Sequence, residues 1–245
     1  MLPLGESLCK MIKHCAGQAA RAYIPFLRSS VWVLLPIWIL FEIVDQYFSM
    51  SAKLAMQGSS KRWVAQIGQL STAITLNFIV ILFLPIRLKD WQEGIRPYRS
   101  WVQIAHTHTW PLFVEGLRMT AYILLWSIAF IIPGIYKQVR YIFVPFVVLL
   151  DLRYQKGEVD ALEQSAELTK GIFGWLLTLF LASFVVDIGF EMLLQIHPVL
   201  VHPAARVLMG GLTLLVSIYF YTIFYFMYDT RINQILLAHS QEESE

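Results

Sequence analysis

The sequence predicts an all-α integral membrane protein with about six transmembrane helices plus amphipathic interfacial helices. Its 245 residues are 57% hydrophobic and 15% charged, and the mean hydropathy is +0.58. An average soluble domain has roughly 45–50% apolar and about 25% charged residues. A soluble fold of this size cannot bury so much apolar surface, because much of any globular protein faces water. Lipid is the solvent that suits this composition.

Six stretches of the chain are apolar enough and long enough to cross a membrane. A helix needs about 20 mostly apolar residues to span the hydrocarbon. Pro133 and Gly134 interrupt the long apolar run at 111–152, and they predict a tight hairpin between two spans. We expect the six spans at 24–44, 63–86, two within 111–152, 172–195 and 207–228.

Amphipathic and polar segments flank the predicted spans. The N-terminal segment alternates apolar side chains, such as Cys15, with lysines at helical spacing, which is typical of a helix lying on a membrane surface. Residues 158–171 have a similar pattern, with an acidic start and a basic end that suit the helix dipole. We expect an interfacial segment at 1–23, a six-span membrane domain at 24–232 and a polar acidic tail at 233–245.

The distribution of lysine and arginine predicts the orientation of the chain. Cytoplasmic loops carry an excess of these residues. If the N-terminus is cytoplasmic, the loops on the inside carry about twice as many lysines and arginines as those outside. We therefore expect a multi-pass protein of the bacterial inner membrane with both termini in the cytoplasm and with membrane lipids as partners. A net charge of +2 without a basic stripe does not indicate nucleic-acid binding.

An extended motif of turn, basic and loop residues runs through the second half of the chain. It begins with an Ile-Pro-Gly turn (Ile132, Pro133 and Gly134) and an early basic residue in the next span (Arg140). A loop of the form A-L-x-x-S-x-x-L-x-K-G follows, with Ala161, Leu162, Ser165, Leu168, Lys170 and Gly171 at its defined positions. The last span ends in Tyr-Asp-Thr-Arg, from Tyr228 to Arg231. This pattern resembles a bacterial six-span inner-membrane family that includes the membrane domain ahead of some glycerophosphodiester phosphodiesterases. The sequence has no counterpart of the phosphodiesterase domain, so the resemblance implies the fold and not that activity.

Charged residues within the spans are candidates for a functional site. An ionisable side chain in a membrane costs about 2.5–3.5 kcal/mol on insertion scales, so each needs an explanation. Glu115 and Arg118 are three residues apart and can pair on one helix face. Such a pair either contributes to a substrate path or a partner contact, or it neutralises itself near the cytoplasmic end of the span. We favour the self-neutralising pair.

A second set of charges is expected together at the opposite membrane face. The set consists of acids at the ends of two spans and cations early in another: Glu42, Asp45, Asp187, Glu191, Lys137 and Arg140. With His197 and His202 nearby, the acids could bind a divalent cation. They could also form ion pairs with the two cations, which requires no ligand, or make no mutual contact. Ion pairing is the interpretation we favour, because the spacing matches no known metal signature.

No motif in the sequence indicates a catalytic reaction. Nucleophile elbows, phosphate loops and metalloprotease signatures are absent from it. We expect no enzyme activity and no cofactor, and the leading hypothesis is a scaffold or accessory subunit of a membrane complex that works with a protein partner or as a homo-oligomer. The alternative is a small transporter or lipid-handling permease that uses the intramembrane charges. A lipid-acting enzyme involving His106 and His108 is the third hypothesis.

Overall fold

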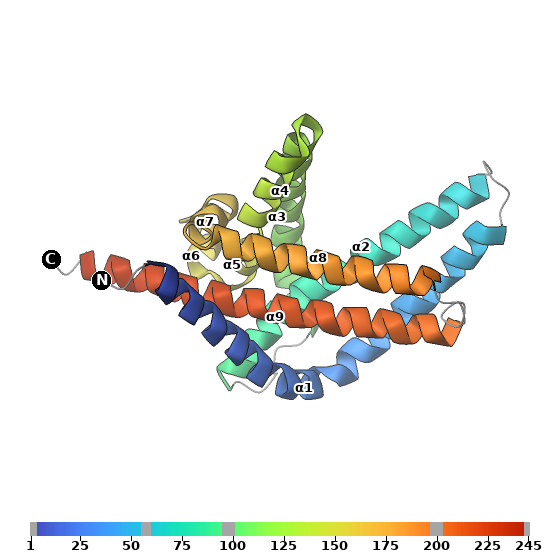
Figure 1. Cartoon of the computed structure of the whole chain (residues 1–245), viewed down its shortest axis with the longest axis horizontal. Coiled ribbons are helices and arrows are strands. Elements are labelled where there is room, and N and C mark those ends of the chain that lie inside the picture. Colours follow the sequence, from blue (N-terminus) through green and yellow to red (C-terminus); the bar gives the residue numbers. More distant parts are fainter. Residues whose placement is uncertain (1–3, 55–59, 95–100, 197–202, 243–245) are drawn as a thin grey trace. The chain divides into compact units, whose positions relative to one another are not determined.

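The computed structural model describes residues 4–54, 60–94, 101–196 and 203–242, which are almost entirely helical (Figure 1). The helices follow the order α1 (Leu4–Leu54), α2 (Ser60–Gln92), α3 (Trp101–Ala129), α4 (Ile131–Arg140), α5 (Val144–Leu150), α6 (Leu152–Gln155), α7 (Ala161–Leu168), α8 (Phe173–Ile196) and α9 (Pro203–Glu242). The described residues contain no strand.

Two compact units divide the chain. Unit 1 comprises Met1–Tyr23, Leu82–Ser183 and Tyr219–Glu245, and unit 2 comprises Ile24–Ile81 and Phe184–Ile218. Helices α1, α2, α8 and α9 each contribute to both units, whereas α3 to α7 belong to unit 1 alone.

Five stretches of the described residues are long and apolar enough to cross a membrane. They are Ser60–Gln92, Gln103–Ala129, Ile131–Leu150, Phe173–Phe190 and Val207–Leu236. These stretches match the second to the sixth predicted spans, and they confirm the expected all-α, multi-pass membrane fold. The first predicted span lies within α1, where several side chains are outside the described part of the chain, so the total of six stays a prediction.

The N-terminal segment is part of α1 and packs on protein. Cys15, Ala19 and Ala22 are buried, and the Cys15 thiol lies 3.5 Å from the Thr230 hydroxyl of α9 within unit 1. The Cys15 side chain therefore faces α9, although the sequence pattern led us to expect it on the membrane. Burial raises the pKa of the Cys15 thiol above its usual value. The expected boundaries at 23 and 232 both fall inside continuous helices, α1 and α9.

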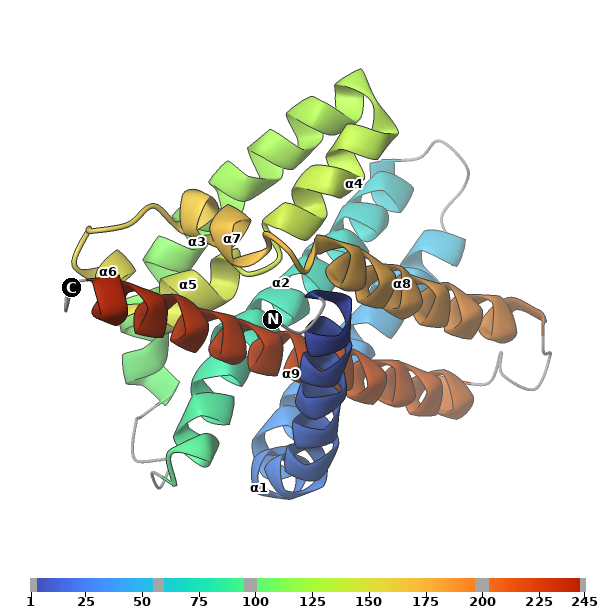
Figure 2. The ribbon, with the colours of Figure 1, turned by 60° about the vertical axis from the view of Figure 1, so that its left-hand side comes forward.

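The predicted hairpin between the third and fourth spans is present, and its turn is very short. Phe130, in an extended conformation, separates α3 from α4. Figure 2 shows the two helices running antiparallel side by side. Pro133 lies in the first turn of α4, where its missing N–H is not needed. A Cβ atom on Gly134 would lie 2.1 Å from the Ser127 hydroxyl of α3, so glycine allows this close approach.

The fourth span is broken, which the sequence pattern did not predict. α4 ends at Arg140, and α5 begins at Val144 after a turn. Five of the seven residues of α5 are buried, and the Phe146 ring packs 4.9 Å from that of Tyr221 and 5.5 Å from that of Tyr228 in α9. Burial of these apolar and aromatic side chains is the main contribution to the core of unit 1.

In unit 2, glycines allow helices to approach closely. A Cβ atom on Gly211 of α9 would lie 3.0 Å from the Trp38 ring of α1, and one on Gly68 of α2 would lie 2.5 Å from the Phe48 ring. Small residues have the same role in other membrane helix interfaces. The Gly210-Gly211 pair therefore contributes to helix packing.

Candidate functional site

Glu115 and Arg118 of α3 form the expected ion pair, and the pair extends to the loop after the fourth span. The Arg118 guanidinium lies 3.5 Å from the Glu115 carboxylate and also donates to the Asp160 carboxylate. The Tyr154 hydroxyl of α6 donates to Glu115 at 3.3 Å. Glu115 is 8% exposed, so its charge is compensated mainly by these protein groups. We call these four residues the polar network.

The local chemistry shifts the pKa values of Tyr154 and Asp160, two members of the polar network. Burial, with the nearby charge of Glu115 and the hydrogen bond to it, raises the pKa of Tyr154 to about 12, so the phenol keeps its proton. Burial of Asp160 would raise its pKa. The hydrogen bonds from Arg118 and from the backbone N–H groups of Glu163 and Leu162 outweigh that effect, so the pKa of Asp160 is below its usual value.

The loop motif of the family resemblance joins several elements of unit 1. The fully buried Ser165 hydroxyl donates to the Arg140 carbonyl at 2.9 Å and accepts from the Phe143 N–H at 3.2 Å. It thereby satisfies backbone groups at the break between α4 and α5. Gly171 has φ of +80°, a conformation that favours glycine, and it ends the turns between α7 and α8.

The Arg231 guanidinium of α9 binds the other end of this loop. It donates to the carbonyl oxygens of Leu168 at 3.3 Å and of Lys170 at 2.9 Å. These carbonyls lie where α7 ends, and helix ends need such partners because their last carbonyls lack intrahelical donors. The loop motif and Arg231 therefore have a structural role: their polar atoms satisfy backbone groups where helices end or break.

Lys137 and Arg140 interact with aromatic rings of their own hairpin. The Lys137 ammonium lies 5.4 Å from the centre of the Trp126 ring and 5.6 Å from that of Tyr141. The Arg140 guanidinium lies 5.6 Å from the centre of the Tyr136 ring. Such cation–π contacts stabilise a charge in a region of low polarity.

The acids expected beside these cations belong to unit 2, whereas Lys137 and Arg140 belong to unit 1. The expected ion pairing between the two sets stays a prediction. Within unit 2, the Glu42 carboxylate of α1 approaches Gly210 of α9, and Asp45 lies one turn further along α1. Asp187 is a half-buried residue of α8. The side chain of Glu191 and the residues His197 and His202 lie outside the described part of the chain.

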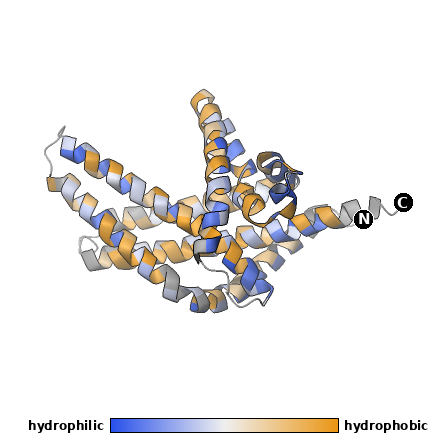
Figure 3. Cartoon of the chain, turned by 180° about the vertical axis from the view of Figure 1, so that it is seen from behind, coloured by the Kyte–Doolittle hydropathy of each residue, from blue (hydrophilic) through white to orange (hydrophobic). Residues whose placement is uncertain are grey.

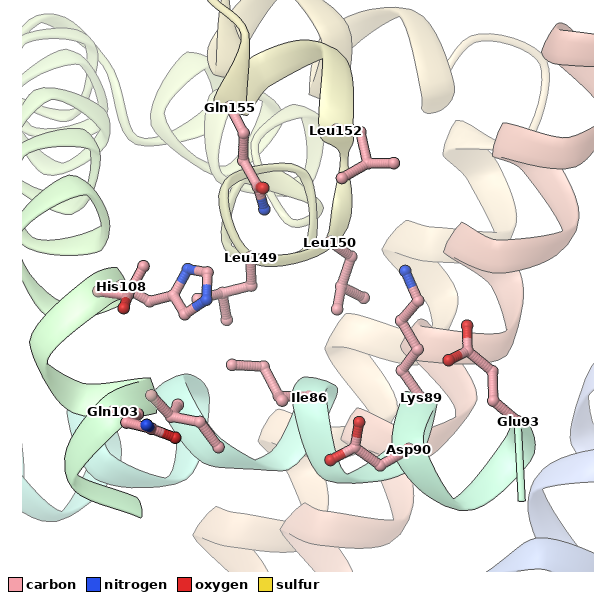
Figure 4. Close-up of a pocket in the computed structure, with 12 residues that line it drawn as sticks. Ile86, Lys89, Asp90, Glu93, Gln103, His108, Leu149, Leu150, Leu152 and Gln155 are labelled. Carbon is pink, nitrogen blue, oxygen red and sulfur yellow. The ribbon is translucent and has the colours of Figure 1, made fainter. Parts of the chain in front are cut away.

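A cavity of about 440 Å³ in unit 1 contains charged residues that the sequence analysis did not select (Figure 4). Its polar lining comes from the end of α2, the start of α3 and α6, and it includes Lys89, Asp90, Glu93, Gln103, His108 and Gln155. Asp90 is 7% exposed. One sequence signal could have identified it: acids at the C-terminal end of a helix are unfavourable because of the helix dipole, and Asp90 and Glu93 are both found there.

The described residues include no group of three or more His, Cys, Asp or Glu side chains that could hold a metal ion. His106 is exposed, and His108 lines the cavity, so the two histidines do not share one site.

Comparisons of the chain with protein-family models, with curated proteins and with solved structures give no match. The family resemblance of the loop motif therefore stays a prediction.

Proposed function

We propose that the chain is a non-enzymatic membrane protein that serves as a scaffold or accessory subunit of a membrane complex, with lipid contacts. The observation that carries this proposal is the polar network. The charges of the third span bind one another and the loop at Asp160, which supports a stabilising role for them rather than a role in transport. A loop that is bonded to several helices suits a protein that positions a partner.

The apolar surfaces of the hairpin are where partner helices or lipids would bind. Ile128, Phe130, Ile131 and Ile132 are each more than 70% exposed at the tip of the α3–α4 hairpin. Figure 3 shows this tip as largely hydrophobic. Apolar surface of this kind is unstable in water and needs lipid or another helix against it.

The proposal places the protein in the bacterial inner membrane with both termini in the cytoplasm, as a relative of the six-span family. The basis is the lysine and arginine bias and the loop motif. Under this orientation, the polar network and the loop at 153–171 face the cytoplasm.

The test is mild native extraction of the tagged protein, followed by mass spectrometry of everything retained. A second protein in stoichiometric amount, or a second copy of the chain, is the expected result. A tagged membrane protein of unrelated sequence and similar span number is the control for non-specific retention. Repeated isolation of a monomer with neither protein nor lipid would overturn the proposal.

A small transporter or lipid-handling permease is the second candidate, and Asp187 is the residue that favours it. This acid lies in the fifth expected span, and it makes no hydrogen bond or ion pair with the residues that the structure describes. Intramembrane acids often mark ion or substrate paths. If this candidate is correct, Asp187→Asn abolishes transport by reconstituted protein, whereas unchanged transport would remove it.

A further inference from the structure

Asp90 is a buried acid without a partner in the part of the chain that the structure describes. It is 7% exposed, and it makes no hydrogen bond or ion pair with the described residues. A carboxylate on a mostly buried residue loses part of its hydration, and such groups are usually found with a partner. The carboxylate faces the cavity in Figure 4, so a ligand in the cavity can supply that partner.

The position of Asp90 at the end of α2 is unfavourable for a negative charge, and hydrogen bonds to α9 hold this end of the helix in place. Asp90 lies in the last turn of α2, and Glu93 follows directly after the helix, where the dipole disfavours negative charge. Between them, the side chain of Gln92 accepts from the Tyr225 hydroxyl at 2.8 Å and donates to the Asp229 carboxylate at 3.2 Å. These bonds to α9 hold the end of α2 in place. Two acids are thus held at an unfavourable site, and a positively charged ligand would stabilise both.

The cavity also contains a positive charge, so a simple cation does not complement it fully. Lys89 lines the same space, and Figure 4 shows its ammonium group extending toward Leu150 and Leu152, apart from the Asp90 carboxylate. The amides of Gln103 and Gln155 can donate and accept hydrogen bonds. A molecule with one positive and one negative group matches this arrangement.

The cavity is lined by residues from the ends of candidate spans, where a membrane-spanning chain meets phospholipid headgroups. The end of α2 and the start of α3 are consecutive in the chain, and the α3–α4 hairpin returns the chain so that α5 ends on the same side. All the cavity residues belong to unit 1, so its geometry is that of one compact body. Leucines and isoleucines from α2, α3 and α5 complete the wall, which suits the glycerol and first acyl carbons of a lipid.

We propose that this cavity binds the phosphoethanolamine headgroup of a phospholipid, with the ammonium at Asp90 and Glu93 and the phosphate at Lys89. A primary ammonium donates three hydrogen bonds, which acids and amide oxygens accept. A choline headgroup has no N–H donor and is usually bound by aromatic rings, and the cavity lining contains no Phe, Tyr or Trp among the described residues. A glycerol headgroup lacks the positive charge. The inference specifies the lipid contacts of the proposed function and rests on them.

The test is native mass spectrometry of the purified full-length chain, titrated with dioleoyl phosphatidylethanolamine, phosphatidylcholine and phosphatidylglycerol. We expect phosphatidylethanolamine to bind at least about tenfold more tightly than the other two lipids, because one charge-assisted hydrogen bond contributes enough binding free energy for a tenfold change in affinity. Asp90→Asn is nearly isosteric and should abolish this preference, leaving the other two lipids unchanged. Glu167→Gln removes an exposed acid of α7 outside the cavity, and it should behave like the unmodified chain.

Three results would overturn the proposal. They are equal binding of the three lipids, an unchanged preference in Asp90→Asn, and binding of soluble phosphoethanolamine as tight as that of the lipid. If Asp90→Asn does not fold, Glu93→Gln provides the same comparison at an exposed position, with a smaller expected loss of preference.

Partner retention, measured separately, distinguishes this proposal from the proposed function. A variant that loses the lipid preference but keeps its protein partner leaves the scaffold role intact. A chain that keeps the lipid preference but has no partner leaves the headgroup site intact.

Discussion

Replacing Ser165 with alanine tests how the break in the fourth span is stabilised. The Ser165 hydroxyl accepts from the Phe143 N–H and donates to the Arg140 carbonyl, at 3.2 and 2.9 Å, in a site with no solvent exposure. Alanine removes both bonds and leaves two backbone groups without these partners, because the turn between α4 and α5 interrupts the regular helical bonding.

The expected cost follows from these two groups. A buried backbone group that loses its hydrogen bond costs about 1–3 kcal/mol. Partial relaxation or entry of water would compensate one of the two, so we expect Ser165→Ala to lower the free energy of unfolding by about 1–3 kcal/mol. The measurement is an SDS titration of protein in mild detergent, followed by tryptophan fluorescence.

Ser183→Ala is the matched control for this measurement. The Ser183 hydroxyl donates to the Phe180 carbonyl of the same helix at 2.8 Å, and the exchange removes the same atom from a half-buried site. We expect less than about 1 kcal/mol there, since the carbonyl keeps its helical environment. Equal stability of Ser165→Ala and the unmodified chain, or equal losses in the two variants, would refute the bridging role of Ser165.

Two further perturbations test the polar network and the loop. Arg118→Gln should destabilise the protein by about 1–2 kcal/mol in the same titration, a value reduced because Arg118 is partly exposed. Asp160 has a lowered pKa when folded, so its contribution to stability is present at neutral pH and is lost as the pH falls through about 4 and below. Arg118→Gln should therefore weaken the loss of stability in acid, and an unchanged pH profile would contradict the pairing. Gly171→Ala should lower the free energy of unfolding by about 1 kcal/mol, because the φ of Gly171 is +80°. Gly174→Ala is the control: it has open space around its Cβ position in α8, so it should be neutral or stabilising. Equal thermal midpoints of the two variants would contradict this difference.

The sequence predicted the features that depend on neighbouring residues. Hydropathy located five spans that the structure contains, because a long apolar run has few alternatives to a transmembrane helix. The hairpin at Pro133 and Gly134 and the pair of Glu115 with Arg118 also follow from short spacings.

Contacts between distant residues were not predictable in this way. Arg118 binds Asp160 across 42 positions, and Ser165 bonds to backbone groups 22 and 25 positions earlier. Spacing gives no information about such pairs, since they depend on how the loop folds back on α3 and α5. The break after Arg140 was also missed, because the residues around it remain apolar and continue the hydropathy of a single span.

The contrast between Glu115 and Asp90 separates structural charges from a candidate ligand site. Both acids are less than 10% exposed and lie in unit 1. Glu115 forms an ion pair with Arg118 and accepts a hydrogen bond from Tyr154, so protein groups compensate much of its charge. Asp90 makes no such bond with the described residues and faces a cavity beside a second acid and a lysine. At Glu115 the protein itself supplies a cation and a donor, whereas the Asp90 carboxylate opens on a cavity. This difference is the physical basis for placing a lipid ammonium at Asp90.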